Sequence, residues 1–265
     1  MAVLQIIGGG KMGEALIGGL ISAGWCAPTD LVVVEPDDQR REELARDHGG
    51  VLAVDGPVAH TDAIAAVKPD IVPAALGALR SVGATRVLSI AAGVTLAAME
   101  EALGAGVPVV RAMPNTPALV GSGAAAIAPG AHADDGDLDW AETILGSVGI
   151  VVRVDETDLD AVTGLSGSGP AYVFALAEAL IDAGRAQGLS GDVAAALTEQ
   201  TLLGAARLLG ESDDPPAVLR ANVTSPGGTT AAGLAVLADA GFDDLIGRVV
   251  AAATARSVEL GRPAD

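Results

Sequence analysis

Short, continuously apolar runs alternate with helical segments through the first half of this chain, and this alternation constrains the fold more than any other feature. The predicted strands cover Val3–Ile7, Leu31–Glu35, Ala63–Val67, Arg86–Ile90 and Val107–Ala112. The predicted helices between them cover Met12–Ala23, Gln39–His48, Asp70–Leu79 and Leu96–Leu103. Strands that are apolar at successive positions are buried on both faces, as in a parallel sheet covered by crossover helices. The alternation therefore predicts an α/β fold with a parallel sheet covered on both faces.

The strand pattern ends near Val154, which divides the chain into residues 1–154 and 155–265. Two further strands are predicted at Gly123–Ala128 and Ile150–Val154, with a helix at Leu138–Gly146 between them. Helices alone follow, at Pro170–Gln187, Asp192–Leu209, Pro216–Ala221, Thr230–Asp239 and Asp243–Leu260. These helices are rich in Ala and Leu with few charged faces, so they need burial on several sides. We expect the helical half to dimerise by interleaving; a compact monomeric bundle is the alternative.

Composition excludes several classes of partner. The formal net charge of −19 argues against nucleic acid and anionic membrane surfaces. Cys26 is the single cysteine, and no Cys/His spacing resembles a metal site, so neither a disulfide framework nor a metal is expected. Neither a signal peptide nor an uninterrupted apolar stretch of about 18 residues is apparent, which predicts a cytoplasmic protein.

A glycine-rich segment, Gly8-Gly9-Gly10-Lys11-Met12-Gly13, follows the first predicted strand and opens the first helix. It fits the G-x-G-x-x-G pattern of dinucleotide-binding loops. In that pattern Gly8 permits the turn, Gly10 lets the backbone approach the pyrophosphate, and Gly13 allows close packing of helix on strand. We expect this loop, including Lys11 and Met12, to bind a dinucleotide. The alternative is that the glycines only allow close packing.

Glu35 ends the second predicted strand, 22 positions after Gly13. A carboxylate at about this spacing hydrogen-bonds the ribose hydroxyls and repels a 2′-phosphate, which favours NADH. Arg40 and Arg41 follow closely and could contact a 2′-phosphate, although solvated charge on a helix surface explains them more simply. The sequence is compatible with either NADPH or NADH.

Three loops at the ends of later strands are further candidates for the cofactor site. They carry Val67-Lys68-Pro69, Ala91-Ala92-Gly93, and Asn115 between Pro114 and Pro117. Ligands of open α/β sheets bind at the carboxyl ends of the strands, where all three loops lie. We therefore expect them to share one site.

The run Thr224-Ser225-Pro226-Gly227-Gly228-Thr229-Thr230 interrupts the helical half. Inside a helix, Pro costs about 3 kcal/mol and each Gly about 1 kcal/mol relative to Ala, so the run is a turn. It supplies unhindered N–H groups and hydroxyls at the start of the helix Thr230–Asp239. Such a helix start binds a small carboxylate or phosphate. A plain loop with a Thr N-cap is the alternative.

Together these segments resemble the pyrroline-5-carboxylate reductase family over nearly the whole chain. The most specific segments are Arg111–Ala118, Gly164–Tyr172 and Ser225–Thr230. The resemblance implies a Rossmann-type dinucleotide-binding domain at 1–154 and a helical substrate-binding and dimerisation domain at 155–265. It also implies reduction of 1-pyrroline-5-carboxylate to L-proline by hydride transfer from NAD(P)H, the last step of proline biosynthesis. Homodimers, often five of them in a decamer, are typical of the family.

The resemblance also implies roles for individual residues. The cofactor would be held by Gly8–Gly13, Val67, Lys68, Pro69 and Ala91–Gly93, with Asn115 near the nicotinamide. The substrate carboxylate would bind Ser225 and the backbone of Gly228 and Thr229. The Thr230 hydroxyl would bond the ring nitrogen, with Asn222 and Glu156 around the same pocket.

Two other functions compete with this one. The first is a related imine or β-hydroxyacid reductase with the same two domains. A β-hydroxyacid dehydrogenase needs a catalytic lysine in the helical domain, and this chain has no lysine after Lys68. A non-catalytic dinucleotide sensor would keep Gly8–Gly13 but has no use for Thr224–Thr230. Reduction of a readily protonated imine demands no His/Asp relay, which agrees with three histidines that all lie away from the candidate sites.

Overall fold

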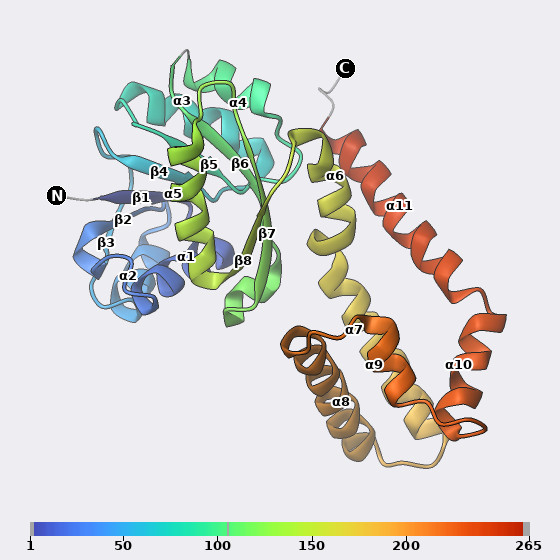
Figure 1. Ribbon diagram of the computed structural model, residues 1–265. Helices are drawn as coiled ribbons and strands as arrows, with labels where there is room; N and C mark the ends of the chain where they lie inside the picture. The colour runs from blue at the N-terminus through green and yellow to red at the C-terminus, as the bar shows by residue number, and fades with distance from the viewer. Residues whose placement is uncertain (1–2, 105, 262–265) are drawn as a thin grey trace. The chain divides into compact units, whose positions relative to one another are not determined.

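The computed structural model describes residues 3–104 and 106–261. They form two compact units: one holds the residues up to Ser168 together with those from Ala251 on, and the other is Gly169–Val250 (Figure 1). The boundary predicted after Val154 separates two functional domains. It stays a prediction, because a division of the chain into compact units does not test it.

An eight-stranded sheet with the order β3-β2-β1-β4-β5-β6-β7-β8 forms the centre of the first unit. Its strands are β1 Leu4–Ile7, β2 Leu31–Val34, β3 Leu52–Val54, β4 Asp62–Ala65, β5 Val87–Ser89, β6 Val109–Met113, β7 Gly123–Pro129 and β8 Gly149–Arg153. All seven predicted strands are confirmed. From β3 to β6 the neighbours are parallel, as predicted.

Two features of the sheet correct the prediction. Strand β7 runs antiparallel to β6, with Arg111 opposite Ala128, and parallel to β8. Only residues 114–122 join β6 to β7, and a parallel return needs a crossover of about a dozen residues or more. The sequence also missed β3, whose three residues are too few to show a periodicity and whose Leu52 is exposed at the sheet edge.

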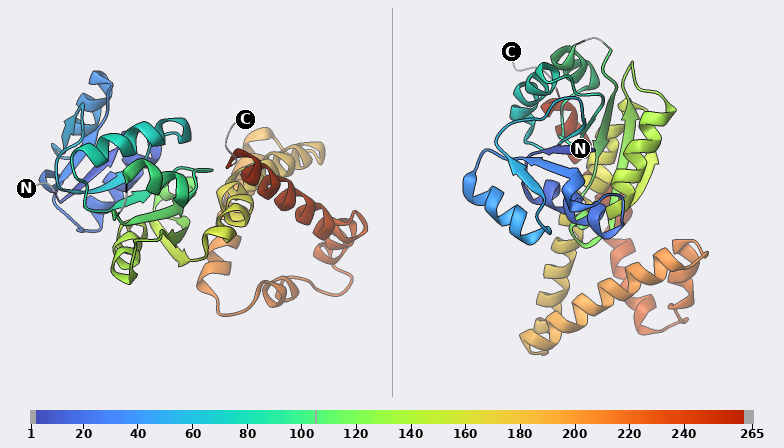
Figure 2. Two further views of the ribbon diagram at one scale, coloured as in Figure 1. Left: turned by 90° about the horizontal axis from the view of Figure 1, so that it is seen from above. Right: turned by 90° about the vertical axis from the view of Figure 1, so that its left-hand side faces the viewer.

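Helices cover both faces of the sheet, as predicted (Figure 2). They are α1 Lys11–Ser22, α2 Asp38–Asp47, α3 Val72–Ser81, α4 Leu96–Leu103, α5 Asp135–Leu145 and α6 Leu159–Val162. Alternate residues of one strand enter two different cores. In β2, Leu31 and Val33 join the core under α1 and α5, whereas Val32 and Val34 join the core under α3 and α4. This two-sided burial explains the continuously apolar strands.

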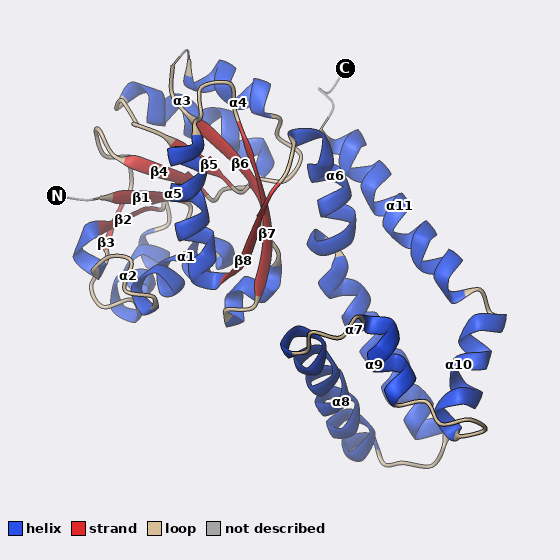
Figure 3. Ribbon diagram, in the orientation of Figure 1, coloured by secondary structure: helices blue, strands red, loops and turns tan. Residues whose placement is uncertain are grey.

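The helices of the second unit are connected by loops alone, without strands (Figure 3). They are α7 Gly169–Ala186, α8 Gly191–Glu211, α9 Pro216–Asn222, α10 Thr229–Asp239 and α11 Phe242–Leu260, which confirms the five predicted helices. The last of them, α11, begins in this unit, and its residues from Ala251 on belong to the first unit. In one copy of the chain, α7 and α10 have no buried residue. Large apolar side chains such as Phe174, Leu197 and Val236 are 65%, 57% and 67% exposed. These faces need a covering partner.

Within the described ranges, every helix is too short or too polar to cross a bilayer.

Candidate functional site

The glycine loop joins β1 to α1 through close backbone contacts. Gly8 has a φ of +105°, and a Cβ added there would lie 2.6 Å from Ala66 O. A Cβ added at Gly13 would collide with the carbonyl oxygen of Gly8. At Gly10, by contrast, an added Cβ would meet nothing within 4 Å, and this N-cap of α1 has no side-chain cap. The loop is thus tightly packed at both ends and open at its middle, where a helix N-terminus favours an anion.

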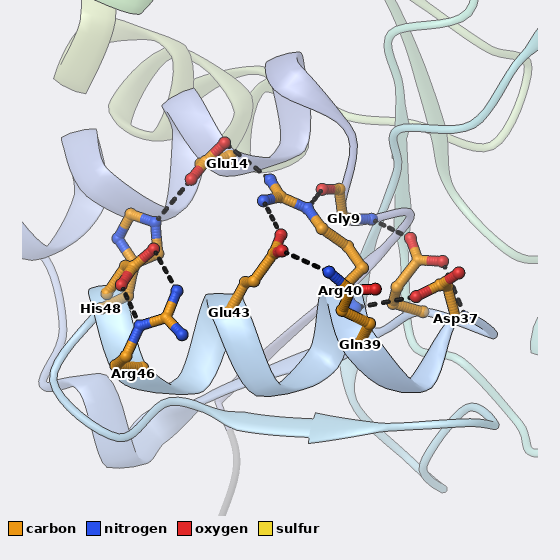
Figure 4. Close-up of polar contacts among 10 residues, drawn as sticks. Gly9, Glu14, Asp37, Gln39, Arg40, Glu43, Arg46 and His48 are labelled. Atoms are coloured by element: carbon orange, nitrogen blue, oxygen red, sulfur yellow. Dashed lines mark hydrogen bonds and ion pairs between the residues drawn. The ribbon is translucent and has the colours of Figure 1, made fainter.

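Glu35 and Arg40 both hydrogen-bond to Gly9, and Figure 4 shows the Arg40 side chain reaching it. Gly9 N donates to Glu35 Oε2 at 2.9 Å, and Arg40 Nε donates to Gly9 O at 2.9 Å. The guanidinium of Arg40 also pairs with Glu14 of α1 at 2.6 Å. The sequence suggested solvated charge or phosphate contact for Arg40 and missed this role, because no local pattern shows that α2 packs beside the glycine loop.

The Glu14–Arg40 pair is charged at neutral pH. Burial raises the pKa of Glu14, but hydrogen bonds from Arg40 and from His48, at 3.4 Å, lower it more, so the pKa lies below its usual range. The hydrogen bond to Glu14 raises the pKa of Arg40. The pair therefore stabilises the position of α1 relative to α2 beside the loop.

Three of the predicted cofactor residues, Pro69, Ala92 and Gly93, line one cavity of about 350 Å³ in the first unit. They lie at the carboxyl ends of β4 and β5, where open α/β sheets bind ligands. The other lining residues are Thr163, Ser168, Ala253, Arg256, Ser257 and Leu260. The sequence missed the four of these residues that lie in α11, because no periodicity shows that the end of this helix returns to the first unit. Ser257 fixes that return by donating to Asp160 Oδ1 at 2.6 Å.

Other predicted cofactor residues surround the same sheet edge. Lys11 and Lys68 are exposed, whereas Ala91 is buried. Met12 and Val67 are half-buried against the two cores. In the part of the chain that the structure describes, no group of three or more His, Cys, Asp or Glu side chains could hold a metal ion.

Asn115 and Glu156 bond to neighbouring segments of the first unit. Asn115 Nδ2 donates to Ser166 O at 3.0 Å, and Ala124 N donates to Asn115 Oδ1 at 2.8 Å. Glu156 Oε1 accepts from Leu96 N and from the Arg111 guanidinium, both at 2.7 Å. Arg111 is only 7% exposed, so Glu156 neutralises a buried charge. The predicted ligand contacts of Asn115 and Glu156 stay predictions beside these structural roles.

In the second unit, Ser225–Gly228 forms a tight turn. Gly228 N donates to Ser225 O at 3.0 Å, and Gly227 has a φ of +70°. Pro followed by a left-handed Gly is the signature of a type II turn. An added Cβ at Gly228 would collide with the Ser225 hydroxyl, so this hydroxyl lies over the turn.

The N-terminus of α10 follows this turn directly. Its N-cap is Gly228, without a side-chain cap, so the alternative of a Thr N-cap is wrong. Thr224 instead donates to Arg220 O at 2.6 Å. Asn222, Ser225, Thr229 and Thr230 are all exposed. The turn thus presents one hydroxyl beside the uncapped amides of an eleven-residue helix, an arrangement that favours an anion.

Comparisons with known proteins match both halves of the chain. The family model described as pyrroline-5-carboxylate reductase dimerisation matches residues 156–260. The model described as NADP oxidoreductase, coenzyme F420-dependent, matches residues 3–93.

Relatives match over nearly the full length. A pyrroline-5-carboxylate reductase from Synechocystis sp. is 44% identical, with 98% of each chain covered. One from Mycobacterium tuberculosis is 42% identical, covering 98% of this chain and 97% of the relative. A solved pyrroline-5-carboxylate reductase from Coxiella burnetii is 34% identical with a TM-score of 0.93, covering 99% of each chain. A solved pyrroline carboxylate reductase from Plasmodium falciparum, with NADP bound, is 33% identical with a TM-score of 0.80, covering 98% of each chain.

Proposed function

The chain belongs to the pyrroline-5-carboxylate reductase family and reduces 1-pyrroline-5-carboxylate to L-proline with NAD(P)H; on this premise we propose how its residues divide the work. Its helical half matches the family's dimerisation domain, so the chain forms a homodimer. We place the functional boundary after Val154, between the dinucleotide-binding domain and the helical domain.

The first unit would hold the cofactor, which supplies the hydride when bound. The open backbone at Gly10 supports this assignment, because it lies at the uncapped start of α1 and leaves room for a pyrophosphate. The residues that we assign to the cofactor are Gly8, Gly10, Lys11, Met12, Gly13, Glu35, Val67, Lys68, Pro69, Ala91, Ala92, Gly93 and Asn115.

The turn before α10 would bind the substrate carboxylate, and this turn is the observation that carries the proposal. The Ser225 hydroxyl and the N–H of Thr229 are the main donors, because Gly228 N–H already closes the turn onto Ser225 O. Charge-assisted hydrogen bonds from these two donors can bind a carboxylate without an arginine in the pocket. The family resemblance also assigns Asn222 and Glu156 to the substrate pocket, but the bonds of Glu156 to Arg111 and Leu96 favour a structural role for Glu156.

Thr230, in the first turn of α10, would bond the ring nitrogen and pass the proton to it. A protonated imine is already a good electrophile, so the protein mainly positions the carbon that accepts hydride and stabilises charge. No histidine relay is required, because Thr230 would pass the proton and the cofactor would supply the hydride.

Replacement of Thr230 tests this proposal. Thr230→Ala should lower turnover by about 10- to 1000-fold, the range for loss of one positioned acid–base or hydrogen-bonding group. The Kd of NADH should stay within about twofold, because Thr230 does not belong to the cofactor loop. Thr230→Ser, which keeps the hydroxyl, is the matched control and should recover most of the turnover. Wild-type turnover in Thr230→Ala would refute the assignment.

We extend the proposal to assembly and location. A decamer of five dimers is supported by the family resemblance and is tested by light scattering of the purified protein. A cytoplasmic location is supported by the need for NAD(P)H, since a charged dinucleotide does not cross a bilayer unaided.

A further inference from the structure

A cluster of charged side chains surrounds the end of β2, beside the glycine loop. We infer that this cluster makes the chain select NADH over NADPH: Glu35 repels a 2′-phosphate, and Arg40 is a positioning residue that holds the loop. The inference rests on the proposed function, because it concerns the dinucleotide that the glycine loop would bind.

The carboxylate of Glu35 is fixed by backbone donors on both oxygens. Gly9 N donates to Oε2 at 2.9 Å, and Asp37 N donates to Oε1 at 3.1 Å. The backbone N–H of Glu35 donates to Val54 O at 2.9 Å, which fixes the main chain at the same point. These bonds hold the carboxylate in place at the position where a Rossmann-type fold receives the adenosine ribose. A ribose 2′-hydroxyl can donate to it, whereas a 2′-phosphate offers mainly acceptors and negative charge.

All three nitrogens of the Arg40 guanidinium already have partners. Nε donates to Gly9 O at 2.9 Å, and the two terminal nitrogens pair with Glu14 at 2.6 Å and Glu43 at 3.2 Å (Figure 4). To reach a 2′-phosphate, Arg40 would have to leave these partners and release the carbonyl of Gly9. Its contribution is thus to the shape of the loop, which both dinucleotides need equally.

Arg41 is also directed toward the protein. One of its terminal nitrogens donates to Glu35 O at 2.6 Å, and the other pairs with Asp38. The two guanidinium groups thus pair with three carboxylates, on Glu14, Glu43 and Asp38. Two more carboxylates of the same segment, on Glu35 and Asp37, accept from backbone N–H groups. A dianionic phosphate placed among them meets net negative charge, and like charges at close range strongly disfavour the wrong partner.

Equilibrium binding of NAD⁺ and NADP⁺ to the wild-type homodimer, measured by isothermal titration calorimetry, tests this inference without turnover. We expect NAD⁺ to bind at least about tenfold more tightly than NADP⁺. Glu35→Gln removes the charge but keeps an acceptor, so NADP⁺ should gain about tenfold in affinity while NAD⁺ stays within about threefold. Glu42→Gln is the matched control: it makes the same charge change on an exposed residue of α2, and it should leave the ratio of the two Kd values within about twofold.

Arg40→Gln separates positioning from phosphate binding. As a positioning residue, Arg40 should affect both dinucleotides equally, so this variant weakens NAD⁺ and NADP⁺ by the same factor. Selective weakening of NADP⁺ would overturn the inference, as would equal or tighter binding of NADP⁺ by the wild type or an unchanged ratio in Glu35→Gln. If the folded wild type bound neither dinucleotide, the proposed cofactor site itself would fail, and the inference with it.

Discussion

An added methyl group should affect different properties at two glycines of the same loop, the stability of the fold at Gly13 and the binding of the dinucleotide at Gly10. In Gly13→Ala the new Cβ collides with the carbonyl oxygen of Gly8, well inside the 3.0 Å that real Cβ atoms respect. In Gly10→Ala the new Cβ meets no atom within 4 Å. The first change should therefore damage the fold, whereas the second should damage only the binding of the dinucleotide.

The size of the first effect follows from the contact. Relief of the collision requires movement of backbone on both sides, which places the cost near the upper end of the range for overpacking, about 3 kcal/mol. Because Gly13 lies in α1, Ala gains about 1 kcal/mol of helix propensity there. The free energy of unfolding should thus fall by about 2 kcal/mol in Gly13→Ala.

Gly10→Ala should leave the free energy of unfolding within about 0.5 kcal/mol of wild type, because a poorer N-cap and a less flexible unfolded chain nearly cancel. Its methyl group occupies the open surface where the pyrophosphate would approach, so the Kd of NADH should rise at least about tenfold. Urea unfolding and calorimetric titration with NADH measure the two quantities on the same samples. Full stability in Gly13→Ala would refute the packing argument, and wild-type affinity in Gly10→Ala would refute the place given to the dinucleotide.

Three further variants test other parts of the account. Glu156→Ala leaves the buried Arg111 without its carboxylate and should lower the free energy of unfolding in urea by about 2–3 kcal/mol; an unchanged value would show that the pair is unimportant. The pKa of Glu14 is lower in the folded chain than its usual value of 4.5, so its contribution to stability is present above that pH and is lost as the pH falls through the lower, folded value. Glu14→Gln should therefore lose less stability than wild type between pH 6 and pH 3 in urea unfolding, and equal losses would contradict this. Gly228→Ala should displace the Ser225 hydroxyl and raise the KM for 1-pyrroline-5-carboxylate by about tenfold; an unchanged KM would count against that hydroxyl as a ligand.

The sequence predicted the elements of the fold because their signals are local. Continuous apolar strands identified β1, β2 and β4 to β8, and Pro226 with two glycines identified the turn before α10. The predicted parallel direction of β7 is wrong, because the alternation of strands and helices does not show in which direction a strand runs. Only the short connection after Met113 indicates that β7 is antiparallel to β6.

Contacts between distant segments explain the rest of what sequence reasoning missed. Arg40 lies 31 positions from Gly9, and Asn115 lies 51 positions from Ser166. No periodicity brings such pairs together, so Arg40 was interpreted as surface charge or a phosphate ligand. The return of α11 to the first unit, through Ser257 and Asp160, is a contact of the same kind.

The central claim is that the turn before α10 recognises the substrate through its carboxylate and that Thr230 acts on the ring nitrogen. The most direct test compares kcat/KM for 1-pyrroline-5-carboxylate and for 1-pyrroline, which lacks the carboxylate, in the wild type, Ser225→Ala and Thr230→Ala. Loss of one charge-assisted hydrogen bond corresponds to about 10- to 100-fold. Ser225→Ala should therefore lower kcat/KM by that factor for the carboxylated substrate alone, whereas Thr230→Ala should lower both values equally. An equal loss for both substrates in Ser225→Ala would contradict the account.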